Sequence, residues 1–300
     1  MVMTGAAVKE SKKASLARIL VATDFSATSE RALEYGISLA RRYNSQIFVT
    51  NVITLDAYPM MAPELASQSE ERLQREAKEG MEKLEKSGRL YGLRREMVIA
   101  EGSLWPTIED LVKQHEIDLV IVGTHGMSTF EKLVIGSNAE QIFRQARVPV
   151  LTVGPAVKGE PLYEAEFKNI LFATDFGPGA EREAAFAFSL AQDHHAKLTL
   201  LNVAPYAEDY SEEAVTRKRV LVTTQLRDLL PNLTELHCMP EYMMVIGEPV
   251  EEILRWAQLK HADLIMMGAK SRKGLAGHVP HTKAQRIISQ AKCPVLTIKS

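Results

Sequence analysis

The sequence is poor in cysteine. Cys238 and Cys293 are its two cysteines in 300 residues, and they lie outside any CxxC pattern. This usage does not fit a secreted domain held together by disulfides, which are typical of oxidising compartments. We therefore expect a protein from a reducing compartment with two buried thiols.

The sequence also lacks long apolar runs and an excess of charge. No run approaches the roughly 18 apolar residues of a membrane span, and residues 1–15 have lysines without the apolar segment of a signal peptide. The 36 basic and 38 acidic residues leave a net charge of −2, which gives no electrostatic footprint for nucleic acid. We expect a cytoplasmic protein with neither a membrane nor a nucleic-acid partner.

The chain contains an internal repeat. RILVATDF, beginning at Arg18, recurs as NILFATDF, beginning at Asn169, and later QARVPVLTV recurs as QAKCPVLTI. A chain of 300 residues also suits two domains of about 150 each. We predict domains over residues 1–153 and 169–300, joined by a linker at 154–168 that is rich in glycine, proline and charge.

Strand and helix patterns alternate within each copy. In the first copy Ser26 or Thr28 is placed to cap the first helix, and a later helix is expected to open at Pro106. Strands are predicted at residues 19–24, 46–53, 95–102, 118–123 and 148–153. Parallel strands need crossover helices, so each half is predicted to be an α/β domain with a doubly wound, five-stranded parallel sheet.

A glycine-rich loop follows the fourth predicted strand. Residues 118–139, DLVIVGTHGMSTFEKLVIGSNA, run from an apolar strand through Gly123, Gly126 and Gly136 to Ser137. Glycines let backbone N–H groups approach an anion, and the first turn of the following helix adds free donors and a positive dipole end. The segment therefore predicts a phosphate-binding loop. Ligands of such sheets bind beyond the carboxyl ends of the strands, which would bring Asp24 to the same crevice.

Signals for catalysis and for metal binding are weak. The sequence has no recognisable Ser-His-Asp or Cys-His arrangement, and the loop lacks the lysine of a P-loop. The pairs His194 with His195 and His278 with His281 lack the further ligands that a metal site needs. We predict no catalytic residue and no metal site, so the sequence supports binding better than turnover.

Together, the repeated ATDFS or ATDFG, the GTHG after an apolar strand, the Gly-Ser pair and the closing VPVLTV resemble the universal stress protein family in its tandem form. The resemblance covers about residues 17–299. It implies a Rossmann-like fold of the adenine nucleotide alpha hydrolase-like kind. It also implies that the two domains pair through their closing strands, and it leaves a homodimer of whole chains open.

The resemblance also implies a nucleotide site. ATP-binding members share glycines in the spacing Gly-x2-Gly-x9-Gly followed by Ser or Thr, which Gly123, Gly126, Gly136 and Ser137 match. ATP is the implied ligand, with Mg²⁺ between its phosphates. The residues implied to hold the phosphates are Gly126, Gly136, Ser137 and Asn138, with Asp24 on the ribose and Ala22, Thr23 and Val52 bordering adenine.

The second copy departs from this motif. It keeps Gly268, but Ser271 and His281 replace the other two glycines. The hydroxyl residues do not discriminate, because Ser137 with Glu140 and Thr282 with Gln285 both fit a capping box that starts a helix. Asp175 is likewise interpreted as a turn residue, a role that Asp24 could also have. We therefore predict one nucleotide site, in the first half.

The leading functional hypothesis is a cytoplasmic ATP-binding regulatory protein of the stress response. One alternative is a slow ATPase that uses the same pocket with a water held by the loop. The other is a non-catalytic scaffold, in which the second domain has become an interaction surface or binds another ligand.

Overall fold

The structure of the protein is a computed structural model. It describes residues 16–54, 63–124, 137–158, 166–206, 211–230, 239–269 and 282–299, without the side chains of 63–66 and 137–138. Gly126, Gly136, Ser271, His281, His278 and Cys238 lie outside these ranges.

The first half contains β1 to β5 and α1 to α4. The strand at Gln46–Ile53 has the predicted bounds, whereas α3 begins at Leu104, before Pro106. Proline is tolerated there because the first turn of a helix does not use its N–H groups. The elements are β1 Arg18–Ala22, α1 Ala27–Tyr43, β2 Gln46–Ile53, α2 Pro63–Lys86, β3 Arg94–Glu101, α3 Leu104–Gln114, β4 Leu119–Gly123, α4 Ser137–Gln145 and β5 Val150–Val153.

The second half repeats this order of strands and helices. Its elements are β6 Asn169–Ala173, α5 Ala180–Asp193, β7 Lys197–Ala204, α6 Glu212–Asp228, β8 Glu241–Ile246, α7 Pro249–Leu259, β9 Leu264–Ala269, α8 Lys283–Gln290 and β10 Val295–Lys299.

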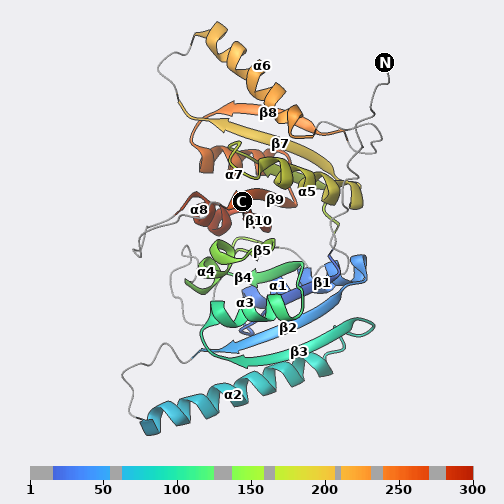
Figure 1. Cartoon of the computed structure of the whole chain (residues 1–300), viewed down its shortest axis with the longest axis vertical. Helices are drawn as coiled ribbons and strands as arrows, with labels where there is room; N and C mark the ends of the chain where they lie inside the picture. The colour runs from blue at the N-terminus through green and yellow to red at the C-terminus, as the bar shows by residue number, and fades with distance from the viewer. Residues whose placement is uncertain are drawn as a thin grey trace, which may run out of the picture.

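The strands in the described ranges form one ten-stranded sheet, in the order β3-β2-β1-β4-β5-β10-β9-β6-β7-β8. Figure 1 shows them stacked from β8 at one end to β3 at the other, with α6 and α2 beside these ends. Each half has the doubly wound order that was predicted, in which the strand order reverses between β1 and β4 or between β6 and β9. Strands pair in parallel within each half.

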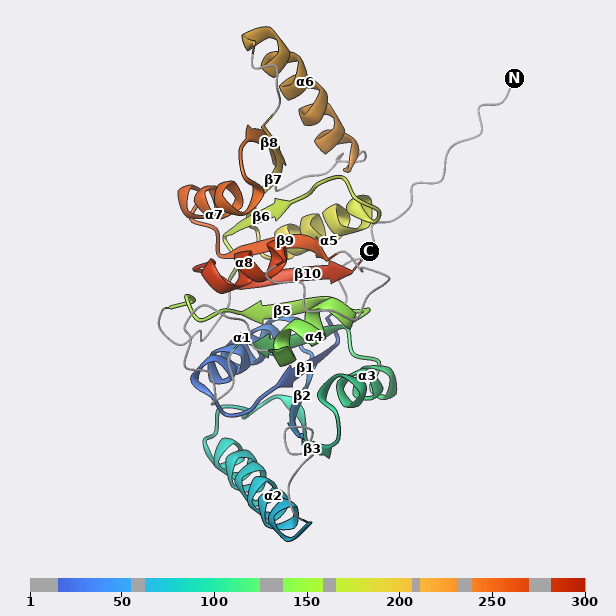
Figure 2. The same ribbon diagram turned by 90° about the vertical axis from the view of Figure 1, so that its left-hand side faces the viewer.

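The closing strands join the two halves. β5 and β10 pair antiparallel, with Leu151 opposite Leu296. This is the pairing that the resemblance implied, and Figure 2 shows the two strands side by side at the centre of the molecule. The exact domain limits at 153 and 169 stay a prediction.

The core consists of two layers, one on each face of the sheet. Alternation along β1 sends Ile19 and Val21 to one layer and Leu20 to the other. The first layer includes Leu33 of α1 together with residues of α5, and the second includes Ile108 of α3 together with residues of α7 and α8. Each layer therefore continues across the junction between the halves.

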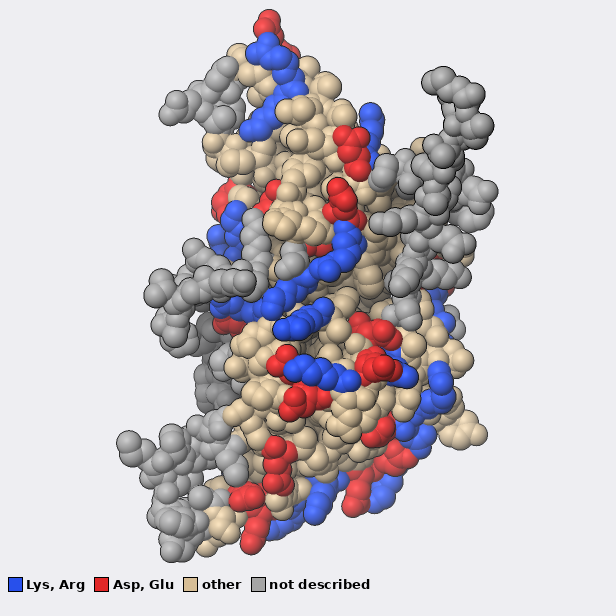
Figure 3. Space-filling model, viewed as in Figure 1, with Lys and Arg blue, Asp and Glu red and all other residues tan. Residues whose placement is uncertain are grey.

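The surface charges and the hydrophobicity of the helices can be compared with the expectations from the sequence. Figure 3 shows basic and acidic side chains interspersed on the face it presents. In the part of the chain that the structure describes, no helix is both long enough and apolar enough to cross a membrane.

Candidate functional site

The turn from β1 into α1 lies at the carboxyl edge of the sheet, beside the point where the strand order reverses. Thr23 N donates to Thr50 O at 2.9 Å, and the Asn51 side-chain amide donates to Thr23 O at 2.8 Å. Phe25 has a left-handed backbone, with φ 61°, and its N–H donates to the hydroxyl of Thr23 at 3.0 Å. Two hydrogen bonds therefore hold this turn to β2, and a third lies within the turn.

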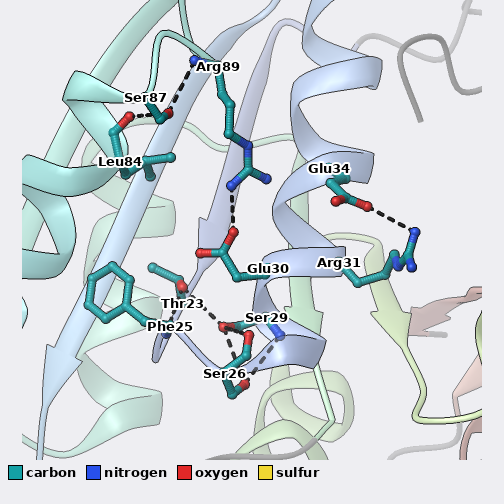
Figure 4. Close-up of polar contacts among 10 residues, drawn as sticks. All are labelled: Thr23, Phe25, Ser26, Ser29, Glu30, Arg31, Glu34, Leu84, Ser87 and Arg89. Carbon is teal, nitrogen blue, oxygen red and sulfur yellow. Dashed lines mark hydrogen bonds and ion pairs between the residues drawn. The ribbon is translucent and has the colours of Figure 1, made fainter. Parts of the chain in front are cut away.

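Asp24 and Ser26 together begin α1. The Asp24 carboxylate accepts from Ser26 N at 3.1 Å, and the Ser26 hydroxyl, the N-cap of the helix, accepts from Ser29 N at 3.3 Å. Figure 4 shows the hydroxyls of Thr23, Ser26 and Ser29 gathered at this helix start. The predicted cap at Ser26 is thus confirmed. Asp24 is exposed, and a carboxylate with one bond to a backbone N–H can accept more, so its ribose role stays a prediction.

The second half builds the same turn. Asp175 accepts from Gly177 N at 3.1 Å, and Phe176 has φ 57°. The Asn202 amide donates to Thr174 O at 2.9 Å. Sequence reasoning missed this role of Asn51 and Asn202, although both stand at the same place in the repeated NV sequence. The turn therefore has a structural function in both halves.

Close packing explains why position 123 is occupied by glycine. A Cβ at this position would lie 2.6 Å from the backbone of Thr28 and Ser29, at the first turn of α1. At Gly268 a Cβ would instead lie 2.7 Å from the carboxylate oxygens of Glu183. Close packing against the backbone of α1 therefore accounts for glycine at position 123, whether or not a phosphate binds, whereas at position 268 the contact is with a side chain.

The remaining predicted site residues divide into two groups. Ala22 and Val52 are half-buried near the carboxyl ends of β1 and β2, beside the Thr23 turn. Ser137 and Asn138 begin α4, and a helix between the parallel strands β4 and β5 starts at this same edge. Gly126 and Gly136 fall outside the described residues, so the loop itself has no described geometry.

The second half has a cavity of about 620 Å³ at the corresponding edge. Ala173, Thr174, Asp175 and Val203 line it, and these are the counterparts of Ala22, Thr23, Asp24 and Val52. Thr282 also lines it and forms the predicted capping box with Gln285. The sequence favoured one ligand site, in the first half, and gave no signal for the size of this second cavity.

Cys293 and His194 are buried, and burial shifts the pKa of each side chain. Burial raises the pKa of the Cys293 thiol to about 12, as expected for an inert buried cysteine. Burial lowers the pKa of His194 to about 4, and its Nδ1 accepts from Phe167 N at 3.2 Å. Among the described residues, no group of three or more His, Cys, Asp or Glu side chains could hold a metal ion.

Comparison with known proteins identifies the family. The model of the universal stress protein family matches residues 16–154 and again 166–299. A universal stress protein of Mycolicibacterium smegmatis is 25% identical over 300 residues, covering 94% of this chain and 96% of that protein. One of Thermus aquaticus is 32% identical over 138 residues, 44% of this chain and 99% of the relative.

A solved structure has the same two-domain architecture. The crystal structure of a universal stress protein from Archaeoglobus fulgidus superposes with a TM-score of 0.67 at 19% identity, covering 95% of this chain and 98% of that one. At this identity the likeness shows the fold alone. With both halves matched by the family model, the chain belongs to the universal stress protein family and carries two of its domains in tandem.

Proposed function

We propose that this protein is a cytoplasmic stress-response regulator that binds ATP in its first half, at the carboxyl ends of β1 and β4. The observation that carries the proposal is the position of Asp24. Its exposed carboxylate lies on a hydrogen-bonded turn beside the point where the strand order reverses. The start of α4 is at the same edge of the sheet. In α/β sheets, ligands bind at this point.

Each part of the edge suits one part of the nucleotide. Ala22 and Val52 are half-buried apolar residues that offer a surface for adenine. Asp24 can accept hydrogen bonds from the two ribose hydroxyls. The first backbone N–H groups of α4, with the glycines before it, suit the phosphates, and Mg²⁺ would balance phosphate charge there.

Regulation by binding fits the site better than rapid turnover. The glycine loop lacks the lysine with which a P-loop contacts the phosphates, and Asp24 already serves the turn. ATP would therefore act by favouring one conformation of the first half and so changing its contacts with a partner. A slow ATPase would use the same pocket, with a loop-held water as the nucleophile.

The test begins with the purified protein. It is denatured, and the released small molecules are separated by chromatography and quantified per chain. ATP at close to one equivalent supports binding, and ADP alone points to the slow ATPase. Absence of nucleotide together with no measurable affinity for added ATP would contradict both.

A further inference from the structure

The cavity in the second half has the size of a small-molecule site. Its volume of about 620 Å³ lies within the range of about 300 to 1,000 Å³ that is typical of ligand pockets. It lies between the ends of β6, β7 and β9 and the starts of α5, α7 and α8. Phe143 and Arg144, on α4 of the first half, complete its wall. The cavity is therefore lined mainly by the second half, with two residues from the first.

The wall of this cavity is mainly apolar, which suits an apolar ligand body. The charged side chains Asp175 and Lys283 are exposed, and Arg144 is bound to Glu140 at 2.7 Å. The apolar lining residues are Phe143, Ala173, Pro178, Leu201, Val203, Pro205, Pro249, Ile253, Met267, Ala269, Ala284 and Ile287.

Glu183 is the buried acidic side chain in the described wall. It is 4% exposed, and its carboxylate lies against Gly268, which also lines the cavity. The first half has Ala32 at this place in the repeat. Glu183 also lies in the first turn of α5, where the helix dipole favours a negative charge. The second copy has therefore placed a carboxyl group where the first has a methyl group.

This carboxylate decides which ligands suit the cavity. A carboxylate has several acceptor positions, so Glu183 can accept from a ligand donor in addition to the interactions it already makes. An ionised carboxylate at this place would repel a phosphate, and a mainly apolar cavity screens that repulsion weakly. The difference between Glu183 and Ala32 thus favours different ligands in the two halves.

We propose that the second-half cavity binds a mainly apolar small molecule that carries an N–H donor and no phosphate, with the donor directed to Glu183. This proposal does not rest on nucleotide binding in the first half. It gives the tandem chain two ligand sites of different chemistry, one in each half.

Two fluorescent probes with the same aromatic body test this proposal. N-phenyl-1-naphthylamine is uncharged and has an N–H donor, and 8-anilino-1-naphthalenesulfonate adds an anionic group. Titrated into the full chain, the amine is expected to bind at one site per chain, and the sulfonate about tenfold or more weaker. Glu183→Gln should narrow that difference. Equal affinity of the two probes, or no binding of the amine, would overturn the proposal.

The location of the probe is tested separately. Ala284→Trp places a large ring in the cavity and should abolish binding of the amine, whereas Ala214→Trp, on α6 outside the lining, should leave it unchanged. The unmodified chain offers a second readout that does not depend on a variant folding. With ¹³C-methyl methionine, the signal of Met267 should shift on adding the amine, while that of Met81, buried in the first half, should not. A shift at Met81 alone, or unchanged binding by Ala284→Trp, would place the probe elsewhere and refute the site.

Discussion

At the residue scale, the two copies of the β1–α1 turn separate structural from ligand-binding functions. Asp24 and Asp175 accept the same kind of backbone hydrogen bond, so this bond alone accounts for aspartate in both copies. A ligand-binding function must therefore appear as a difference between them. Asparagine keeps a side-chain oxygen that can accept the turn's hydrogen bond and removes the charge.

Asp24→Asn is expected to weaken ATP binding by about tenfold to a hundredfold, because hydrogen bonds to a charged acceptor are lost. Asp175→Asn is the matched control and should leave the ATP affinity unchanged. Isothermal titration of both variants measures the effect. Equal affinities of the two variants would show that Asp24 has only the turn function.

Gly123 provides a second residue-scale prediction. A methyl group at this position would meet the backbone of Thr28 and Ser29, which cannot move aside without shifting α1. Gly123→Ala should therefore lower the free energy of unfolding by about 1 to 3 kcal/mol even without nucleotide. Gly268→Ala meets only the flexible side chain of Glu183 and should cost less. Urea unfolding compares the two variants, and a larger loss for Gly268→Ala would contradict this explanation.

At the scale of elements, the ends of α1 and α5 meet across the two halves. The Tyr43 and His194 rings lie 5.9 Å apart, and Arg42 donates to the carbonyl of Asp193. Asn44, directly after α1, and His195, two residues after the end of α5, have left-handed backbones, with φ 52° and 51°. The pair His194 and His195 is thus explained by a buried contact and a helix end, without a metal.

This contact predicts how stability depends on pH. Burial, and next Arg42, lower the pKa of His194 to about 4 from an ordinary 6.5, so the unfolded chain binds the proton more readily. The contribution of neutral His194 to the free energy of unfolding is complete above pH 6.5. It is lost as the pH falls toward 4, by on the order of 2 kcal/mol after allowing for partial solvent contact. His194→Phe should remove this part of the dependence, as seen in melting temperatures at pH 7.5 and 5. His261→Asn, at an exposed site, should not. The same pH slope in His194→Phe would refute the assignment.

The elements also show what the sequence could and could not predict. Local patterns predicted β2, the Ser26 cap and the capping box of Thr282, because each depends on neighbouring residues. The buried carboxylate of Glu183 could not be predicted, since an acidic residue in a first helical turn is ordinarily solvent-exposed. Its burial follows from the packing of α5 against Gly268, a contact between residues far apart in the chain.

At the scale of the whole molecule, the continuous sheet and core predict that the two halves unfold together. Leu151 of β5 is opposite Leu296 of β10, and both belong to a hydrophobic layer shared by the halves. Trp105 lies in the first half and Trp256 in the second, so Trp256→Phe and Trp105→Phe leave one reporter in each. Both single-tryptophan proteins should unfold at the same urea concentration.

Leu151→Ala should lower both midpoints together, with a loss of about 2 to 5 kcal/mol for a buried leucine. Fluorescence during urea unfolding follows each half. Separate midpoints for Trp105 and Trp256, or a shift confined to the first half, would show that the junction does not couple them.

We propose that this tandem chain has one ATP site, in its first half. Equilibrium titration of the folded protein with ATP tests this, comparing Gly136→Val, which places a branched side chain in the predicted phosphate loop, with His281→Gly in the second copy. We expect one equivalent of ATP per chain, loss of binding in Gly136→Val and unchanged binding in His281→Gly. Unchanged ATP affinity in a folded Gly136→Val protein would contradict it.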